Sequence, residues 1–216
     1  MTCDQQRFKR DVADHVMTIV RDDGVDRHIK FGNKDGGSPY WFEILTWAGT
    51  LCIHGDCGTF VFSRLTDMFK FFRTDRGNDP SKLYINEGYW CEKLQAVDCN
   101  GYGKGAARKF DPEEFKSRVK EHVESYLEGY EITDERRADL WDSIHSEILG
   151  YVDNYSSEYV AFHRMHEFHD DEFPELFTDC WEWDCDEYTF RFLWNLYAIA
   201  WAIRKYDAAK AEKRAA

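Results

Sequence analysis

The chain has 216 residues and a formal net charge of −13 at pH 7, and 43% of its residues are hydrophobic and 17% aromatic. A chain of this size and composition can bury a substantial core, which excludes an intrinsically disordered protein. Its most apolar run, residues 190–203, contains Arg191 and Asn195 and is shorter than the roughly 20 residues of a membrane span, so we expect a buried helix there.

The N-terminal part of the sequence predicts a helix followed by a small antiparallel sheet. Apolar residues recur at helical spacing over residues 4–22, and Gly24 is the expected stop. Glycine-containing turns then separate four β-prone runs, residues 27–31, 40–47, 51–54 and 59–63. Their short connections predict a meander with one face packed on the first helix. Candidates for its buried faces are Trp41 or Phe42, which point to opposite sides, with Ile44, Trp47, Leu51, Ile53, Phe60 and Phe62.

The pattern between residue 64 and residue 110 is less regular. Residues 66–73 predict a short helix capped by Thr66 or Asp67. Residues 88–97 fit a helix, and the glycine-rich stretch 100–105 predicts a loop. Because the composition changes just after this loop, it is a candidate boundary within the chain.

From Asp111 onward the sequence predicts helices. Asp111 is the expected cap of the first, because a proline and two glutamates follow it directly. Thr133 begins a second helix that is expected to end at Gly150, and two more are predicted over about residues 156–170 and 186–206. The last is apolar almost all round, so we expect it at the centre of a helical layer.

These elements predict an α+β fold without an internal repeat. Residues 1–110 form the N-terminal helix with a four-stranded antiparallel meander. Residues 111–216 form a helical unit of about four helices packed on it, so that the chain makes one compact structure.

The charge is spread unevenly along the chain. Residues 1–110 carry a net charge of +1, residues 111–187 carry 6 Lys/Arg against 24 Asp/Glu, a net charge of −18, and residues 188–216 carry +4. A field of this sign opposes direct binding to nucleic-acid phosphates or to an anionic membrane, and it favours a basic partner. The alternative is an acidic helical surface that serves only solubility.

The cysteines indicate a reducing compartment. There are seven, an odd number, and the first residues of the chain are charged and lack the apolar segment of a signal peptide. The closest pairs are Cys52 with Cys57 and Cys180 with Cys185. Each pair has four intervening residues, so neither has the spacing of a zinc knuckle. We expect reduced thiols in an intracellular protein.

Histidines and carboxylates gather near residue 166. On a helix, His163, His166, Glu167 and Asp170 fall on one arc, and imidazole with carboxylate can hold zinc, manganese or iron. No second cluster completes a site of known type, so His163, His166 and Asp170 are only weak candidates for metal ligands. The alternative is a solvated polar face, and no cofactor is expected.

Two further patterns have a chemical and a structural interpretation. Cys57 with His54 as base is a candidate nucleophile, although a tight hairpin explains the glycines around it. Basic residues interleaved with aromatic ones form a candidate surface for single-stranded nucleic acid, although at helical spacing the aromatics are more typical of a core. This second set is Arg64, Lys70, Arg73 and Arg76 with Phe69 and Phe72.

Residues 15–73 contain a distinctive series of short strings. These include HVMTI at 15–19, Thr46-Trp47 with Gly49, Gly55-Asp56 with Gly58, and Asp67-Met68-Phe69. Together they resemble a family of uncharacterised accessory proteins carried by temperate bacteriophages and prophages. The resemblance implies a phage-encoded protein in the bacterial cytoplasm and carries over no catalytic role. Ala48 stands where the family pattern has proline.

Three functional hypotheses follow. The first is an acidic, non-enzymatic inhibitor of a host nucleic-acid-binding defence complex, of anti-CRISPR or anti-restriction type, which occupies a basic nucleic-acid groove. The alternatives are a metal-dependent hydrolase using His163, His166 and Asp170, and a scaffold or regulator. On the first hypothesis, reversing the charge of residues 170–172 leaves the fold intact. The residues expected to contact the basic partner are Glu167, Asp170, Asp171, Glu172, Asp184, Asp186 and Glu187.

Overall fold

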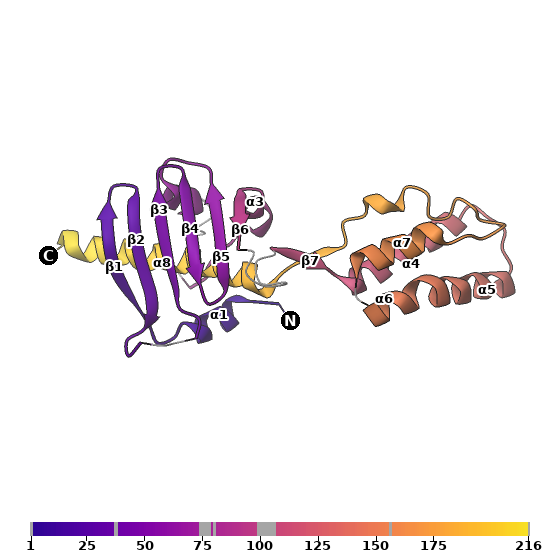
Figure 1. The fold of residues 1–216 in the computed structure, drawn as a ribbon, viewed down its shortest axis with the longest axis horizontal. Coiled ribbons are helices and arrows are strands. Elements are labelled where there is room, and N and C mark those ends of the chain that lie inside the picture. Colours follow the sequence, from indigo (N-terminus) through magenta and orange to yellow (C-terminus); the bar gives the residue numbers. More distant parts are fainter. Residues whose placement is uncertain are drawn as a thin grey trace. The chain divides into compact units, whose positions relative to one another are not determined.

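A computed structural model describes residues 2–36, 39–73, 79, 81–98, 107–155 and 157–215 (Figure 1). The chain divides into two compact units. Unit 1 combines Met1–Ala107 with Tyr188–Ala216, and unit 2 is Arg108–Glu187. In the sequence, unit 2 is therefore inserted into unit 1.

Unit 1 contains a six-stranded antiparallel sheet whose strands follow one another in chain order. A short helix, α1 (Gln5–Asp11), precedes the sheet, and the Asp4 carboxylate caps it by accepting the N–H of Arg7. The strands are β1 (His15–Asp23), β2 (Asp26–Asn33), β3 (Phe42–Trp47), β4 (Thr50–Gly55), β5 (Gly58–Ser63) and β6 (Leu94–Val97). The α+β class is confirmed, whereas the expected four-stranded meander lacks β1 and β6.

The prediction of a single helix over residues 4–22 is wrong in its second half. The helix ends at Asp11, and His15–Asp23 is an edge strand that pairs with β2 along its whole length. Val16, Thr18, Ile19 and Val20 are β-branched and favour a strand. Met17 and Ile19 face the core while Val16 and Val20 are exposed, an alternation that also happens to match several helical spacings.

One face of the sheet forms the core of unit 1. Alternate residues of the central strands are buried, including Ile29, Phe31, Phe42, Ile44, Leu51, Ile53, Phe60 and Phe62. The period of two settles the choice at β3: Phe42 is inside and Trp41 outside. The same period corrects the expectation for Trp47, because Thr46 takes the buried position and the indole is 46% exposed.

The long helix α8 (Phe190–Ala215) covers the buried face of the sheet. Trp194 packs against Phe42 at 5.6 Å between ring centroids, and Phe192 against Phe60 at 5.5 Å. This corrects the expected place of the last helix, which was a helical layer beyond residue 111. Its apolar circumference reflects contacts with both the sheet and α1.

Two short helices complete unit 1. Asp67 caps α2 (Met68–Arg73) by accepting the N–H of Phe69, as expected. The helix expected over residues 88–97 is instead α3 (Glu87–Cys91) followed by β6. The predicted loop at 100–105 lies outside the described residues.

Unit 2 is mainly helical. Its helices are α4 (Pro112–Leu127), α5 (Asp134–Ile144), the π-helical turn η1 (His145–Leu149), α6 (Gly150–Tyr155), α7 (Glu158–Glu167) and the 3-10 turn η2 (Cys180–Glu182). The short strands β7 (Arg108–Phe110) and β8 (Asp186–Tyr188) pair with each other. The expected caps Asp111 and Thr133 are confirmed, whereas Gly150 continues the helical path instead of ending it.

The core of unit 2 is separate from that of unit 1. It is formed by the apolar side of α4, by α5 to α7, and by the segment that follows α7. Phe115, Val119, Val123, Leu140 and Ile144 are fully buried in it. Each unit therefore has a hydrophobic core of its own.

Candidate functional site

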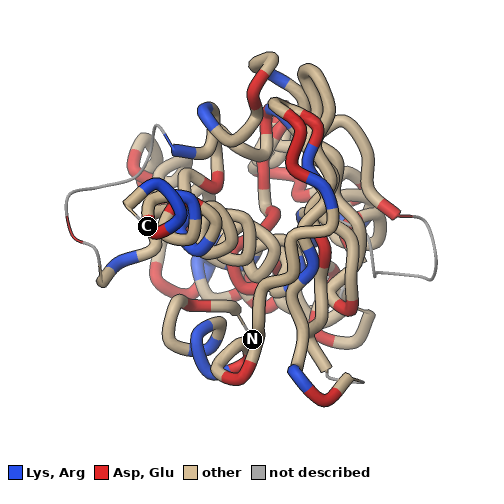
Figure 2. The backbone as a smooth tube through the Cα atoms, turned by 90° about the vertical axis from the view of Figure 1, so that its left-hand side faces the viewer, with Lys and Arg blue, Asp and Glu red and all other residues tan. Residues whose placement is uncertain are grey.

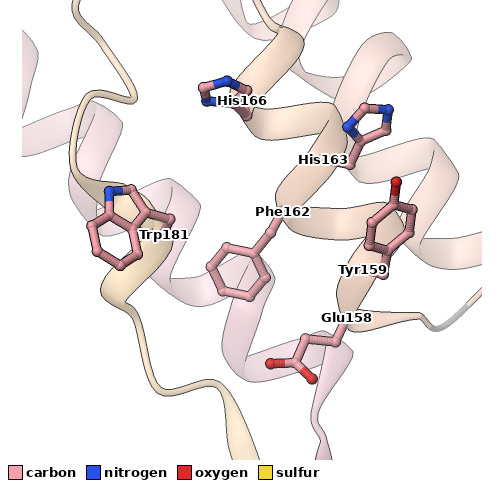
Figure 3. Close-up of a pocket in the computed structure, with 6 residues that line it drawn as sticks. All are labelled: Glu158, Tyr159, Phe162, His163, His166 and Trp181. Carbon is pink, nitrogen blue, oxygen red and sulfur yellow. The ribbon is translucent and has the colours of Figure 1, made fainter.

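The outer side of α7 forms one wall of an open groove of about 500 Å³ in unit 2. Five lining residues, Glu158, Tyr159, Phe162, His163 and His166, lie on α7. Steps of three and four residues along a helix place such side chains on the same side. Figure 3 shows Trp181 of η2 facing them, with the ring of Phe162 between.

Aromatic rings make up most of this groove. Phe162 is anchored from behind, because its ring contacts the buried Phe115 edge-on at 5.4 Å. Tyr159 stacks on His163 with centroids 5.5 Å apart and an angle of 15° between the rings. Tyr159 and Trp181 are 75% and 67% exposed, which makes them the two most exposed large hydrophobic residues in the described chain. Exposed aromatics in a hollow are typical of binding sites.

The surroundings of the groove are acidic. Unit 2 carries 8 Lys/Arg and 24 Asp/Glu, a net charge of −16, whereas unit 1 carries 20 against 17, a net charge of +3. Figure 2 marks Lys and Arg in blue and Asp and Glu in red along the backbone. Glu158 lines the groove, and none of the described lining residues is Lys or Arg. Arg164, on the same helix, is engaged elsewhere: it lies 4.0 Å from the ring centroid of Tyr151 and 3.6 Å from the Glu167 carboxylate.

Asp170, the most central of the residues expected to contact a partner, is engaged within unit 2. Both of its carboxylate oxygens accept from Arg136, at 2.5 and 2.6 Å, and Oδ1 also accepts the N–H groups of Glu172 and Phe173. Burial opposes ionisation, but these donors hold the pKa of Asp170 below its ordinary value. The expectation that charge reversal at residues 170–172 leaves the fold intact therefore disagrees with this geometry.

Most of the other expected contact residues are also paired. Glu172 accepts from Arg136, Asp184 from Arg108, and Glu187 pairs with Lys109. Glu167 contacts His163 and Arg164, and the fully exposed Asp171 lies 3.3 Å from His169. Asp186 is half-buried in β8. The seven residues thus lie in two places, at and just after the end of α7 and around β8, and do not form one unpaired row.

A different carboxylate row lies on α5. Glu135, Asp139 and Asp142 are exposed and make no ion pair within the described residues. Their spacing of four and three residues puts them on one side of the helix. This row was not among the residues expected from the sequence, although its helical spacing is visible there.

The weak metal candidates are not brought together. No group of three His, Cys, Asp or Glu side chains in the described part of the chain could hold a metal ion. His163 stacks on Tyr159, and Asp170 is held by Arg136. His122 also has partners, since its Nε2 lies 2.5 Å from the carbonyl oxygen of Leu176.

The hairpin between β4 and β5 does not present a nucleophile. Cys57 is buried, and burial raises the pKa of its thiol to about 12. Its carbonyl accepts from Asn195 of α8, and His54 Nδ1 lies 2.8 Å from Thr59 Oγ1 on the neighbouring strand. The imidazole therefore has another partner, and a thiol this basic is not activated.

At the candidate basic and aromatic surface, the aromatic residues belong to the core, as the structural alternative held. Phe69 and Phe72 are buried, and Arg73 pairs with Asp207 of α8. Arg76 lies outside the described residues.

Comparisons with protein-family models, with curated proteins and with solved structures found no match to this chain. None of the helices in the described ranges combines the length and the apolar character that crossing a membrane requires.

Proposed function

We propose that this protein is a non-enzymatic binding protein whose unit 2 engages a basic surface of another macromolecule. The observation that carries the proposal is the separation of charge between the units, −16 on unit 2 against +3 on unit 1. The ion pairs inside unit 2 use most of its few cations and leave most carboxylates unbalanced. A field of this kind attracts a basic partner over long distances and raises the association rate.

The carboxylate row on α5 arranges part of this negative charge in a line. Successive charges on Glu135, Asp139 and Asp142 are about 6 and 4.5 Å apart along the helix axis, from the rise of 1.5 Å per residue. A line of negative charges a few ångströms apart is what a basic nucleic-acid groove recognises. The row therefore supports the nucleic-acid groove of a partner as the surface that unit 2 occupies.

The target class in this proposal is a host defence complex that binds nucleic acid, of CRISPR or restriction type. It rests on the resemblance of residues 15–73 to phage accessory proteins. Such a complex presents a basic groove inside a bacterial cell, and occupation of that groove would exclude its nucleic acid.

The test is capture of bacterial proteins on the immobilised full-length chain at low and high salt, with the triple variant Glu135→Lys, Asp139→Lys and Asp142→Lys beside the parent. We expect a nucleic-acid-binding partner that is released by salt, is displaced by nucleic acid, and is captured much less by the variant. The lost capture should come from slower association.

A matched control changes the same charge in unit 1, through Asp14→Lys, Asp23→Lys and Asp26→Lys, which are all exposed. This control should capture the partner as the parent does. If both variants lose capture of the partner equally, only the net charge of the protein matters. If the α5 variant captures the partner as well as the parent does, the proposed role of unit 2 is wrong.

A further inference from the structure

We infer that the groove between α7 and η2 receives a cationic side chain, arginine or lysine, from the partner. This rests on the proposed function and specifies the chemistry of its contact. The groove is the one lined by Glu158, Tyr159, Phe162, His163, His166 and Trp181 (Figure 3).

The groups that line the groove combine aromatic rings with a carboxylate. Tyr159 and Trp181 present ring surface to solvent on the two sides, and Phe162 lies between them. The faces of aromatic rings carry negative potential and attract cations. Glu158 adds a carboxylate, and the described lining has no Lys or Arg that would repel a cation. An anionic ligand would meet both Glu158 and the charge of the whole unit.

Within the chain itself, arginines contact an aromatic ring and a carboxylate at the same time. Arg136 lies 5.4 Å from the ring centroid of Phe173 and pairs with Asp170. In the same unit, Arg164 lies 4.0 Å from the Tyr151 centroid and 3.6 Å from Glu167.

Unit 1 repeats this arrangement, because Arg27 lies 4.6 Å from the ring centroid of Phe69 and pairs with Asp67. In all three cases, one guanidinium contacts an aromatic face and a carboxylate together. The groove offers the aromatic and acidic halves of this arrangement, and no arginine of the described lining fills it.

Exposed aromatic side chains contribute little to the free energy of folding. They contribute much more to the free energy of binding when a partner covers them, which is why tyrosine and tryptophan are common hot spots. A guanidinium suits such a place because it is planar and weakly hydrated, and it can stack on a ring while it pairs with a carboxylate. The acidic field then steers the partner, and the groove holds one of its side chains.

The experiment titrates the full-length protein with Nα-acetyl-arginine N-methylamide and with the matching lysine compound, followed by NMR of the tryptophan indole N–H signals. The uncharged isostere Nα-acetyl-citrulline N-methylamide is the control ligand. The signal of Trp181 is assigned from the variant Trp181→Phe. We expect a saturable shift of this signal with at least one cationic compound, and about tenfold weaker binding of the citrulline compound.

The variants test the groove itself. Trp181→Ala and Tyr159→Ala should each weaken cation binding about 2- to 5-fold, as expected for the loss of one cation–π contact at an exposed ring. Because Trp181→Ala removes the indole signal, binding to the variants is followed through the backbone N–H signals of α7. Glu158→Gln should also weaken it. Tyr155→Ala is the matched control, because Tyr155 is 65% exposed in the same unit but does not line the groove. Circular dichroism would check that each variant is folded.

Equal binding of the citrulline compound, unchanged binding in Trp181→Ala, or no binding of either cation would overturn the inference. Its failure can be told apart from that of the proposed function. The α5 charge reversal should abolish partner capture and leave binding of the arginine compound unchanged. If Trp181→Ala still captures the partner at full strength, the inference fails and the proposed function stands. If the protein binds the cationic compound but captures no basic partner, the groove binds cations and the proposed function fails.

Discussion

Asp170 shows how a single carboxylate can be structural in a strongly acidic segment. Its side chain is only 11% exposed, and it joins α5, through Arg136, to the backbone of the turn that follows α7. The neighbouring Asp171 is fully exposed. Two adjacent aspartates therefore have different roles, which their common charge does not reveal.

We predict that Asp170→Ala lowers the free energy of unfolding by about 2 kcal/mol, because Nη2 of Arg136 and two backbone N–H groups lose their acceptor, while Nε of Arg136 keeps Glu172. Asp171→Ala should change it by less than about 0.5 kcal/mol. Urea unfolding followed through the helical circular dichroism signal measures both. Similar effects at the two positions would show that the Arg136 pair contributes little.

The pH dependence of this difference can also be predicted. The folded-state pKa of Asp170 is lowered, so its contribution is present in full above the ordinary aspartate pKa of about 3.9 and is lost as the pH falls through the folded-state value. The stability gap between the parent and Asp170→Ala should stay constant from about pH 7 to about pH 5 and shrink below about pH 4. A gap that widens on acidification would contradict the assigned pairing. Unfolding at several pH values measures it.

At the scale of the element, the sheet of unit 1 has a buried face and an open face. Phe62 is fully buried and contacts Phe72 and Phe192 from two different helices. Trp47 lies on the other face and is partly exposed, although its side chain is also large and aromatic. The period of two along each strand explains this division.

We predict that Phe62→Ala costs about 3–5 kcal/mol of unfolding free energy, because it leaves a cavity between the sheet and its covering helices. Trp47→Ala removes a larger side chain and should cost under about 1 kcal/mol, since that indole is partly solvated. Thermal and urea unfolding of the two variants provide the comparison. A larger loss for Trp47→Ala would mean that the open face is covered.

The sequence predictions succeeded where a feature depends on residues close together in the chain, and failed where it depends on distant ones. Caps such as Asp111 and Thr133 act within one helical turn, so the sequence showed them directly. The strand His15–Asp23 was missed because a half-exposed edge strand can match helical spacing. The place of α8 and the pairing of Asp170 with Arg136 depend on contacts between distant parts of the chain, which local patterns do not contain. The groove could be predicted only in part. Its α7 residues share a helical face that the sequence shows, whereas Trp181 belongs to another segment.

At the scale of the whole molecule, the inserted position of unit 2 is the main organising feature. The backbone N–H of Thr189 donates to the carbonyl of Ala107 at 2.9 Å, so the chain leaves and re-enters unit 1 at neighbouring residues. All buried residues of the first core belong to unit 1. A short loop that joins Ala107 directly to Tyr188 would therefore cost little conformational entropy.

We predict that a chain in which residues 108–187 are replaced by a short Gly-Ser linker still folds. Its sheet and α8 should unfold cooperatively, and Phe62→Ala should destabilise it as it does the full chain. Partner capture should be lost, because the acidic unit is absent. A shortened chain without cooperative unfolding would show that unit 1 depends on the insertion.

The hydrogen bond between Thr189 and Ala107 also determines how the molecule responds to tension. Both ends of the chain belong to unit 1, where α1 packs directly against α8 through the rings of Phe8 and Trp194. A force applied between the two ends therefore acts on unit 1, and unit 2 bears no force while unit 1 stays folded. In single-molecule stretching we expect unit 1 to rupture first and the extension of unit 2 to follow, so a partner held by unit 2 would not feel strain applied at the ends of the chain until unit 1 has unfolded.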